Sequence, residues 1–111
     1  MSLSKNILGK LREIAGAKGL LTDTVDLTAY SFDGTTSWQS LPEAVVFPTT
    51  AEQVSRILKL ANEQGIPVTP RGAGSNLSGG SVPIAGGIVL CTTRMNRILG
   101  IDADNFTITV E

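Results

Sequence analysis

The stretch from Pro70 to Pro83, PRGAGSNLSGGSVP, has the residue types in this sequence that best suit the binding of an anion. Glycine tolerates positive φ and lets another molecule approach the backbone, so a glycine-rich loop can present successive N–H groups to a concavity. Concave arrays of amides of this kind bind phosphates and other anions. The glycines that would build the array are Gly72, Gly74, Gly79 and Gly80. The stretch therefore predicts a phosphate or pyrophosphate cradle.

Side chains of the same stretch could add to this cradle. Hydroxyl and amide donors would come from Ser75, Asn76 and Ser78, and Arg71 would supply a positive charge. The alternative interpretation is a flexible surface loop. A generic linker would seldom place a lone arginine between a proline and a glycine directly after an apolar strand, and this favours the binding interpretation.

Two familiar phosphate-binding motifs do not fit the loop. The dinucleotide fingerprint G-x-G-x-x-G would need a third glycine where Leu77 stands, and no helical pattern follows it. The P-loop G-x-x-x-x-G-K-[ST] would need a lysine where Gly80 stands. The sequence thus predicts a backbone cradle without the N-terminus of a helix behind it.

The elements before the loop predict a β-α-β unit. The apolar run from Ala44 to Phe47 is typical of a strand covered on both faces, and Pro48 ends it. Thr49 and Glu52 have the spacing of a capping box, which predicts the start of a helix. The apolar stripe expected on that helix is Val54, Ile57, Leu58 and Ala61.

That helix should end at Gly65, because glycine suits the left-handed position that closes a helix. Residues 66–70 then predict a second strand, joined to the first by a right-handed crossover, and the glycine loop follows it directly. Beyond the loop, residues 86–93 predict another buried strand. Residues 97–101 and 106–110 flank the turn sequence DADN and predict an antiparallel hairpin. The residues expected on its covered face are Phe106, Ile108 and Val110.

The N-terminal part of the chain predicts a helix followed by a surface connection. Apolar residues recur at helical spacing from Ser4 to Ala15, with Ser4 as the N-cap and Gly16 as the stop. The polar segment of residues 22–40 has no sustained period and is expected to be extended. Its Tyr30 and Trp38 are interpreted as packing anchors rather than site residues.

Composition excludes several classes of function. The chain has 111 residues, a net charge of −1 and Lys and Arg spread along it, so no basic surface for nucleic acid is expected. Its apolar runs are too short for a membrane span. Without histidine it can hold neither a Ser-His-Asp triad nor a zinc site of His and Cys ligands, and we expect no metal site. The single Cys91 agrees with a cytoplasmic protein, which is our expectation.

The order of these features resembles a known family. The capped helix, the loop PRGAGSN and the later RMNRI follow one another in AVVFPTTAEQVSRILKLANEQGIPVTPRGAGSNLSGGSVP and GGIVLCTTRMNRIL. From about residue 21 to residue 111 the chain resembles the N-terminal part of the FAD-binding domain of the vanillyl-alcohol oxidase type, also called the PCMH type. Within that family it is most similar to the glycolate oxidase and D-lactate dehydrogenase branch.

The resemblance implies an α+β fold, with an N-terminal helix in residues 1–20 and the first part of the FAD-binding domain in residues 21–111. It implies that the loop wraps the FAD pyrophosphate. The residues assigned to that contact are Pro70, Arg71, Gly72, Ala73, Gly74, Ser75, Asn76, Gly79 and Gly80. Relatives that attach FAD covalently through this loop carry a histidine near the position of Ser75, so the serine implies non-covalent FAD.

The resemblance also implies the function of the complete protein, which would be oxidation of a small 2-hydroxy acid such as glycolate or D-lactate. Partners would be the remainder of the FAD domain, a cap domain and an electron-acceptor subunit. The sheet is expected to continue beyond Glu111, and no catalytic residue is assigned within these 111 residues, so the chain alone is expected to be inactive. The alternative function is a stand-alone nucleotide- or anion-binding module.

Overall fold

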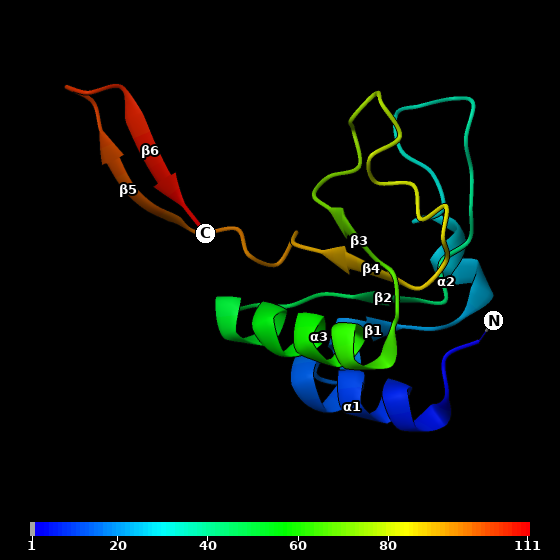
Figure 1. Cartoon of the computed structure of the whole chain (residues 1–111). Helices are drawn as coiled ribbons and strands as arrows, with labels where there is room; N and C mark the ends of the chain where they lie inside the picture. Colours follow the sequence, from blue (N-terminus) through cyan, green and yellow to red (C-terminus); the bar gives the residue numbers. More distant parts are fainter. Residues whose placement is uncertain (1) are drawn as a thin grey trace.

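The computed structural model describes residues 2–111 and shows a sheet flanked by helices, with a separate hairpin that stands away from it (Figure 1). In chain order the elements are α1 (Lys5–Ala15), the 3-10 turn η1 (Ala17–Gly19), β1 (Leu20–Leu21), α2 (Thr24–Thr28), β2 (Ala44–Val46), α3 (Ala51–Gln64), β3 (Val68–Arg71), β4 (Ile88–Cys91), β5 (Ile98–Asp102) and β6 (Thr107–Val110). This content of helix and strand confirms the predicted α+β class. No helix among residues 2–111 has the length and apolarity needed to cross a membrane.

The main sheet has the strand order β1-β2-β4-β3, in which β4 lies between the two strands of the predicted β-α-β unit. β4 pairs in parallel with both neighbours, so Ile88 lies opposite Ala44 on one side and Val68 on the other. β1 pairs antiparallel with β2 at the edge. Every residue of β2 and β4 is buried, as expected for parallel strands covered on both faces.

Alternate residues of the central strands pack into two cores, one on each face of the sheet. α1 and α3 pack side by side against one face of the sheet (Figure 1). The core on that face contains Leu11, Ile14, Ala15, Leu20, Ala44, Val46, Ile57, Leu60, Ile88 and Leu90. The core on the opposite face contains Leu27, Val45, Phe47, Val89 and Cys91. The second core lies beneath the glycine loop, because Cys91 Sγ is 3.7 Å from the carbonyl oxygen of Gly72.

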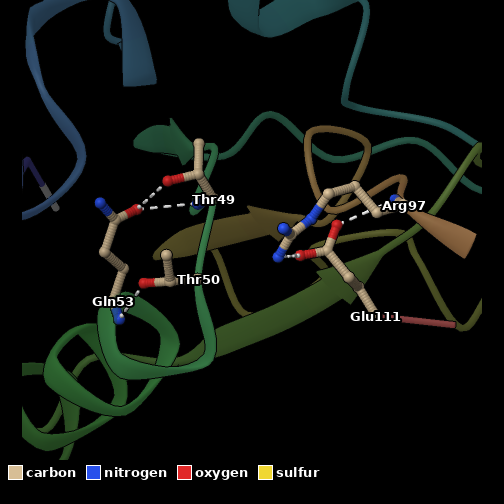
Figure 2. Close-up of polar contacts among 5 residues, drawn as sticks. All are labelled: Thr49, Thr50, Gln53, Arg97 and Glu111. Atoms are coloured by element: carbon tan, nitrogen blue, oxygen red, sulfur yellow. Dashed lines mark hydrogen bonds and ion pairs between the residues drawn. The ribbon is translucent and has the colours of Figure 1, made fainter. Parts of the chain in front are cut away.

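α3 begins one residue later than the predicted capping box. Thr50, not Thr49, is the N-cap, and its Oγ1 accepts a hydrogen bond from the Gln53 amide at 3.1 Å. The Gln53 side chain in turn accepts from the Thr49 amide at 2.8 Å, so glutamine takes the role assigned to Glu52 (Figure 2). The prediction was wrong because Thr49 and Thr50 both offer a hydroxyl three residues before an acceptor side chain.

The buried stripe of α3 is shifted as well. Leu58 is 45% exposed, whereas Leu60 is 7% exposed and faces the sheet. The end of the helix is confirmed, because Gly65 has φ 63° and closes it in the left-handed conformation. α1 is also confirmed, with Ser4 Oγ accepting from the Ile7 amide at 3.2 Å.

The predicted extended connection contains a short helix, α2. Asp23 caps it by accepting a hydrogen bond from the Val25 amide at 2.9 Å. With one buried apolar residue, Leu27, it is too short to show a helical period. The prediction of an extended segment is therefore wrong for residues 24–28. Residues 31–40 contain no helix or strand, but Ser31 and Asp33 within them are buried.

The hairpin β5–β6 is confirmed, but its predicted covered face is not. The two strands pair with each other, and every residue of both is exposed. Phe106 is 96% exposed and Ile108 57% exposed, because the hairpin projects away from the body (Figure 1). At its base Arg97 donates to the Glu111 carboxylate at 2.9 Å (Figure 2).

Candidate functional site: the glycine loop

The glycine loop leaves the carboxyl end of β3 and leads back to β4, as the sequence predicts. It lies beside the surface connection that follows α2, so two segments about 40 residues apart form one structural unit (Figure 1). Ligands of open parallel sheets bind at the carboxyl ends of strands. The loop therefore has the position of a binding site as well as the composition of one.

The backbone amides of the loop are its main hydrogen-bond donors for a ligand. Among the described residues, 2–111, none of the amides from Ala73 to Gly80 donates a hydrogen bond to another part of the chain. The first amide that does so is that of Ser81, which donates to Asp33. Backbone N–H groups are obligatory donors, and a run of eight without protein partners must bind water or a ligand. This is the donor set that an anion cradle needs.

The Arg71 side chain lies between the first half of the loop and the segment that follows α2. Its Nη1 donates to the carbonyl oxygen of Phe32 at 2.6 Å, and its guanidinium carbon lies 5.2 Å from the centre of the Tyr30 ring. The guanidinium also fills the space next to Gly74, which has φ 72°. The structure thus gives Arg71 a contact with the neighbouring segment, in addition to the charge for which the sequence singled it out.

Asp33 organises the second half of the loop. It is 8% exposed, and its Oδ2 accepts from Asn76 Nδ2 at 2.6 Å and from the Ser81 amide at 3.4 Å. Its Oδ1 accepts from the Thr35 amide at 2.7 Å. Desolvation raises the pKa of Asp33, but these hydrogen bonds outweigh it and hold the pKa below the ordinary value of 3.8. The carboxylate is therefore ionised at neutral pH.

Both ends of the Asn76 side chain are engaged within the protein. While Nδ2 donates to Asp33, Oδ1 accepts from Ser81 Oγ at 3.0 Å. The predicted role of the Asn76 side chain as a ligand donor therefore competes with this network. Its backbone amide is free. Ser75 and Ser78 are exposed at the tip of the loop.

The glycines of the loop divide into two kinds. Gly74 and Gly79 have positive φ, and an added Cβ would collide with Arg71 and with Trp38 respectively. Gly72 and Gly80 do not have positive φ, and a Cβ on Gly72 would meet no atom within 4 Å. The first kind shapes the loop, and the second leaves open space beside the backbone.

Of the two aromatic residues predicted to be packing anchors, Tyr30 is confirmed, whereas Trp38 is packed on one side and otherwise exposed. The Tyr30 ring packs edge-on against Phe47, with centroids 5.7 Å apart, and desolvation by this packing raises its pKa. Trp38 is 55% exposed but lies directly against Gly79. Tyr30 thus contacts Arg71, and Trp38 contacts Gly79 of the loop.

Sequence reasoning missed Asp33 and Gly34. A Cβ on Gly34 would lie 2.7 Å from the Asn76 carbonyl oxygen, so the two segments approach backbone to backbone. A local signal existed, because an Asp followed by Gly and Thr is typical of a turn in which the carboxylate accepts from the amide two residues on. That signal predicts the bond to Thr35 but not the bonds across to the loop.

Comparison with known proteins identifies this arrangement. The family model described as FAD binding domain matches residues 42–111, which include β2, α3, β3, β4, the hairpin and the whole glycine loop. The chain belongs to this family of FAD-binding domains. Its cofactor is FAD, and the resemblance seen in the sequence is confirmed.

Relatives of this FAD-binding domain include oxidoreductases. Glycolate oxidase subunit GlcD of Bacillus subtilis is 38% identical over 109 residues, which are 98% of this chain and 23% of that protein. D-lactate dehydrogenase of Archaeoglobus fulgidus is 51% identical over 81 residues, which are 69% of this chain and 18% of that protein. The chain thus spans less than a quarter of the length of either relative.

Solved structures show the same fold. p-Cresol methylhydroxylase, with 28% identity, superposes with a TM-score of 0.75 over 90% of this chain and 21% of its own. Alkyldihydroxyacetonephosphate synthase superposes with a TM-score of 0.83 over 98% of this chain and 24% of its own, at 21% identity. The second likeness speaks for the fold alone.

The residues of the loop fit FAD. The two phosphates of FAD are acceptors without donors, which matches the free amides between Ala73 and Gly80. The open side of Gly72 leaves room for a close approach. The Asp33 carboxylate accepts its hydrogen bonds from Thr35, Asn76 and Ser81, so it does not compete with an anion for the amides between Ala73 and Gly80.

Proposed function

We propose that the loop from Pro70 to Gly80 binds the pyrophosphate of FAD through its backbone amides, in an oxidoreductase that acts on a small 2-hydroxy acid. The observation that carries the proposal is the run of amides from Ala73 to Gly80 without partners in the described chain. Charge-assisted hydrogen bonds from several such amides act together on one ligand.

The predicted contact residues keep separate roles in this proposal. Backbone groups of Gly72 to Asn76 and of Gly79 and Gly80 face the phosphates. Arg71, the last residue of β3, supports the loop and adds a positive charge close to it, and Pro70 precedes it in the strand. Non-covalent binding is proposed because Ser75 stands near the position where relatives that attach FAD covalently through this loop have a histidine.

The substrate class rests on the relatives. Those similar to this chain include a glycolate oxidase subunit and D-lactate dehydrogenases, whose names specify 2-hydroxy acids. Bound FAD supplies the acceptor for a hydride from the carbon that bears the hydroxyl group. The chain described here supplies cofactor binding. A proton acceptor for the substrate, the cap and an electron-acceptor subunit are proposed to lie elsewhere, so the 111 residues alone are inactive.

A pair of glycine substitutions tests the cradle in the full-length protein that carries this sequence. Gly72→Ala adds a methyl group to the open side of the loop, and Gly100→Ala adds one to the exposed hairpin, where it also meets no atom within 4 Å. We expect Gly72→Ala to raise the dissociation constant for FAD about tenfold, equivalent to about 1.4 kcal/mol, and Gly100→Ala to leave it unchanged. Flavin fluorescence titration measures both. Equal affinities would overturn the assignment of the loop.

The substrate class needs a separate measurement. The purified flavoprotein is mixed anaerobically with glycolate or D-lactate, and bleaching of the flavin absorbance is recorded. Bleaching by either acid supports the proposal. A protein that binds FAD but is bleached by no 2-hydroxy acid would favour the alternative of a nucleotide-binding module without this activity.

A further inference from the structure

The carboxylate of Asp33 is a negative charge next to a loop that is expected to bind an anion. It is nearly buried, and it makes its three hydrogen bonds to donors of the protein, at 2.6 Å, 2.7 Å and 3.4 Å. A buried carboxylate is costly unless such donors satisfy it. Its position therefore calls for a role other than direct contact with phosphate.

The partners of Asp33 define that role. One oxygen accepts from both Asn76 and Ser81, which lie on either side of the stretch from Leu77 to Gly80. Ser81 Oγ also donates to Asn76 Oδ1, so the two ends of this stretch are joined to each other as well as to the carboxylate. A loop whose ends are held together has less conformational freedom to lose when a ligand binds.

The other oxygen fixes Asp33 itself. Oδ1 accepts from the Thr35 amide, which orients the carboxylate from its own segment. Next to it, Gly34 allows the backbone of that segment to approach the Asn76 carbonyl closely. Trp38, further along the segment, covers Gly79. Asp33 thus provides the side-chain hydrogen bonds that join this segment to the second half of the loop.

We propose that Asp33 is a positioning residue that holds the second half of the glycine loop in its binding shape before FAD arrives. The inference rests on the proposed function of the loop. Asp33 does not touch the cofactor. It acts through Asn76 and the Ser81 amide, and it keeps the amides between them directed outward. Loss of the carboxylate is expected to leave the two cores intact, because Asp33 belongs to neither.

The test compares Asp33→Asn with Asp104→Asn, a matched control in the turn of the exposed hairpin. Both are made in the full-length protein labelled with 5-fluorotryptophan, and the Trp38 resonance is assigned by its loss in Trp38→Phe. In the flavin-free protein we expect Asp33→Asn to shift or broaden the Trp38 fluorine resonance, because the ring lies on Gly79. Asp104→Asn should leave it unchanged.

The second readout is affinity. Asp33→Asn is expected to weaken FAD binding about tenfold, the effect of losing one hydrogen bond to a charged group, while the unfolding temperature without flavin falls only slightly. A purely structural role would instead lower the unfolding temperature without flavin and leave affinity for FAD unchanged in the folded fraction. That result, or an unchanged Trp38 resonance in folded Asp33→Asn, would overturn the proposal.

A second variant keeps the test valid if Asp33→Asn does not fold. Asn76→Ala removes the partner on the loop and leaves the bond from Asp33 to Thr35. It should give the same change at Trp38, and the double variant should be no worse than either single one, because both break one contact. Independent, additive effects would contradict the proposal.

The two proposals fail in different ways. If the unmodified protein does not bind FAD but Asp33→Asn still alters Trp38, the function of the loop is wrong and its support by Asp33 stands. If the protein binds FAD and the Trp38 resonance and the affinity of Asp33→Asn are both unchanged, the role of Asp33 is wrong.

Discussion

Two glycine pairs in this chain look alike in sequence and differ in structure. Gly79 and Gly80 belong to the loop, and Gly86 and Gly87 precede β4. The second pair is closed by hydrogen bonds, because the Gly86 amide donates to the Pro83 carbonyl at 2.9 Å and the Gly87 carbonyl accepts from the Glu43 amide at 2.8 Å. The amides of the first pair have no partner in the described chain.

The difference shows that glycine content does not by itself mark a ligand site. Positive φ occurs in both regions, at Gly79 and at Gly86 and Gly87. What separates them is whether the amides are already used by the protein. In the turn before β4 the Gly86 amide donates to the Pro83 carbonyl and the Gly87 amide to the Glu43 carboxylate, whereas in the loop the amides are free for a ligand.

The largest effect is expected from Gly87→Ala, which should damage stability and not binding. A Cβ at this position would lie 3.0 Å from the Pro67 carbonyl carbon, and the residue has φ 72°. We expect the free energy of unfolding to fall by about 2 to 4 kcal/mol, a value typical of strain at a special backbone conformation.

Denaturant unfolding measures this loss. Gly9→Ala in α1 is the control, because its Cβ meets no atom within 4 Å and alanine favours a helix. The folded fraction of Gly87→Ala should bind FAD normally. Loss of FAD affinity with unchanged stability would place the turn, and not only the loop, in the binding site.

Gly74→Val should show the opposite pattern, with loss of flavin and a smaller loss of stability. Its φ of 72° disfavours a branched side chain, and the added atoms would displace the Arg71 guanidinium from beneath the loop. We expect purified protein to retain little flavin while unfolding loses about 1 to 2 kcal/mol. The ratio of flavin to protein absorbance measures retention. Full retention would show that the shape of the first half of the loop does not matter for binding.

The smallest expected effect is a change in the stability of the folded state at acid pH. Hydrogen bonds hold the pKa of Asp33 below its ordinary value, so the ionised carboxylate stabilises the folded state. That contribution is complete above the ordinary pKa and is lost as the pH falls through the lowered folded-state value. The difference in unfolding midpoint between the unmodified protein and Asp33→Asn should therefore shrink between pH 6 and pH 3. A difference that grows on acidification would contradict the direction of the shift.

Local chemistry allowed much of this fold to be predicted, whereas contacts between distant segments could not be predicted. Gly65 and Ser4 end and begin helices through bonds to residues within a turn, and both were found from sequence. The position of β4 between β2 and β3 depends on pairing between strands that are far apart in the sequence. The spacing of residue types along the chain does not reveal this pairing. Asp33 was missed for the same reason, because its partners on the loop lie more than 40 residues away. The glycine loop itself was predicted because its composition is local.

The central place of β4 has a consequence for synthesis of the chain. β2, α3 and β3 leave the ribosome before β4, yet β2 and β3 do not pair with each other, because β4 fills the position between them. Until Ile88 to Cys91 emerge, both strands expose unpaired backbone edges and apolar residues, which other chains can bind. The glycine loop connects β3 to the strand that closes this gap. Its length and freedom therefore matter for how quickly the nascent sheet is protected, as well as for the proposed binding of FAD.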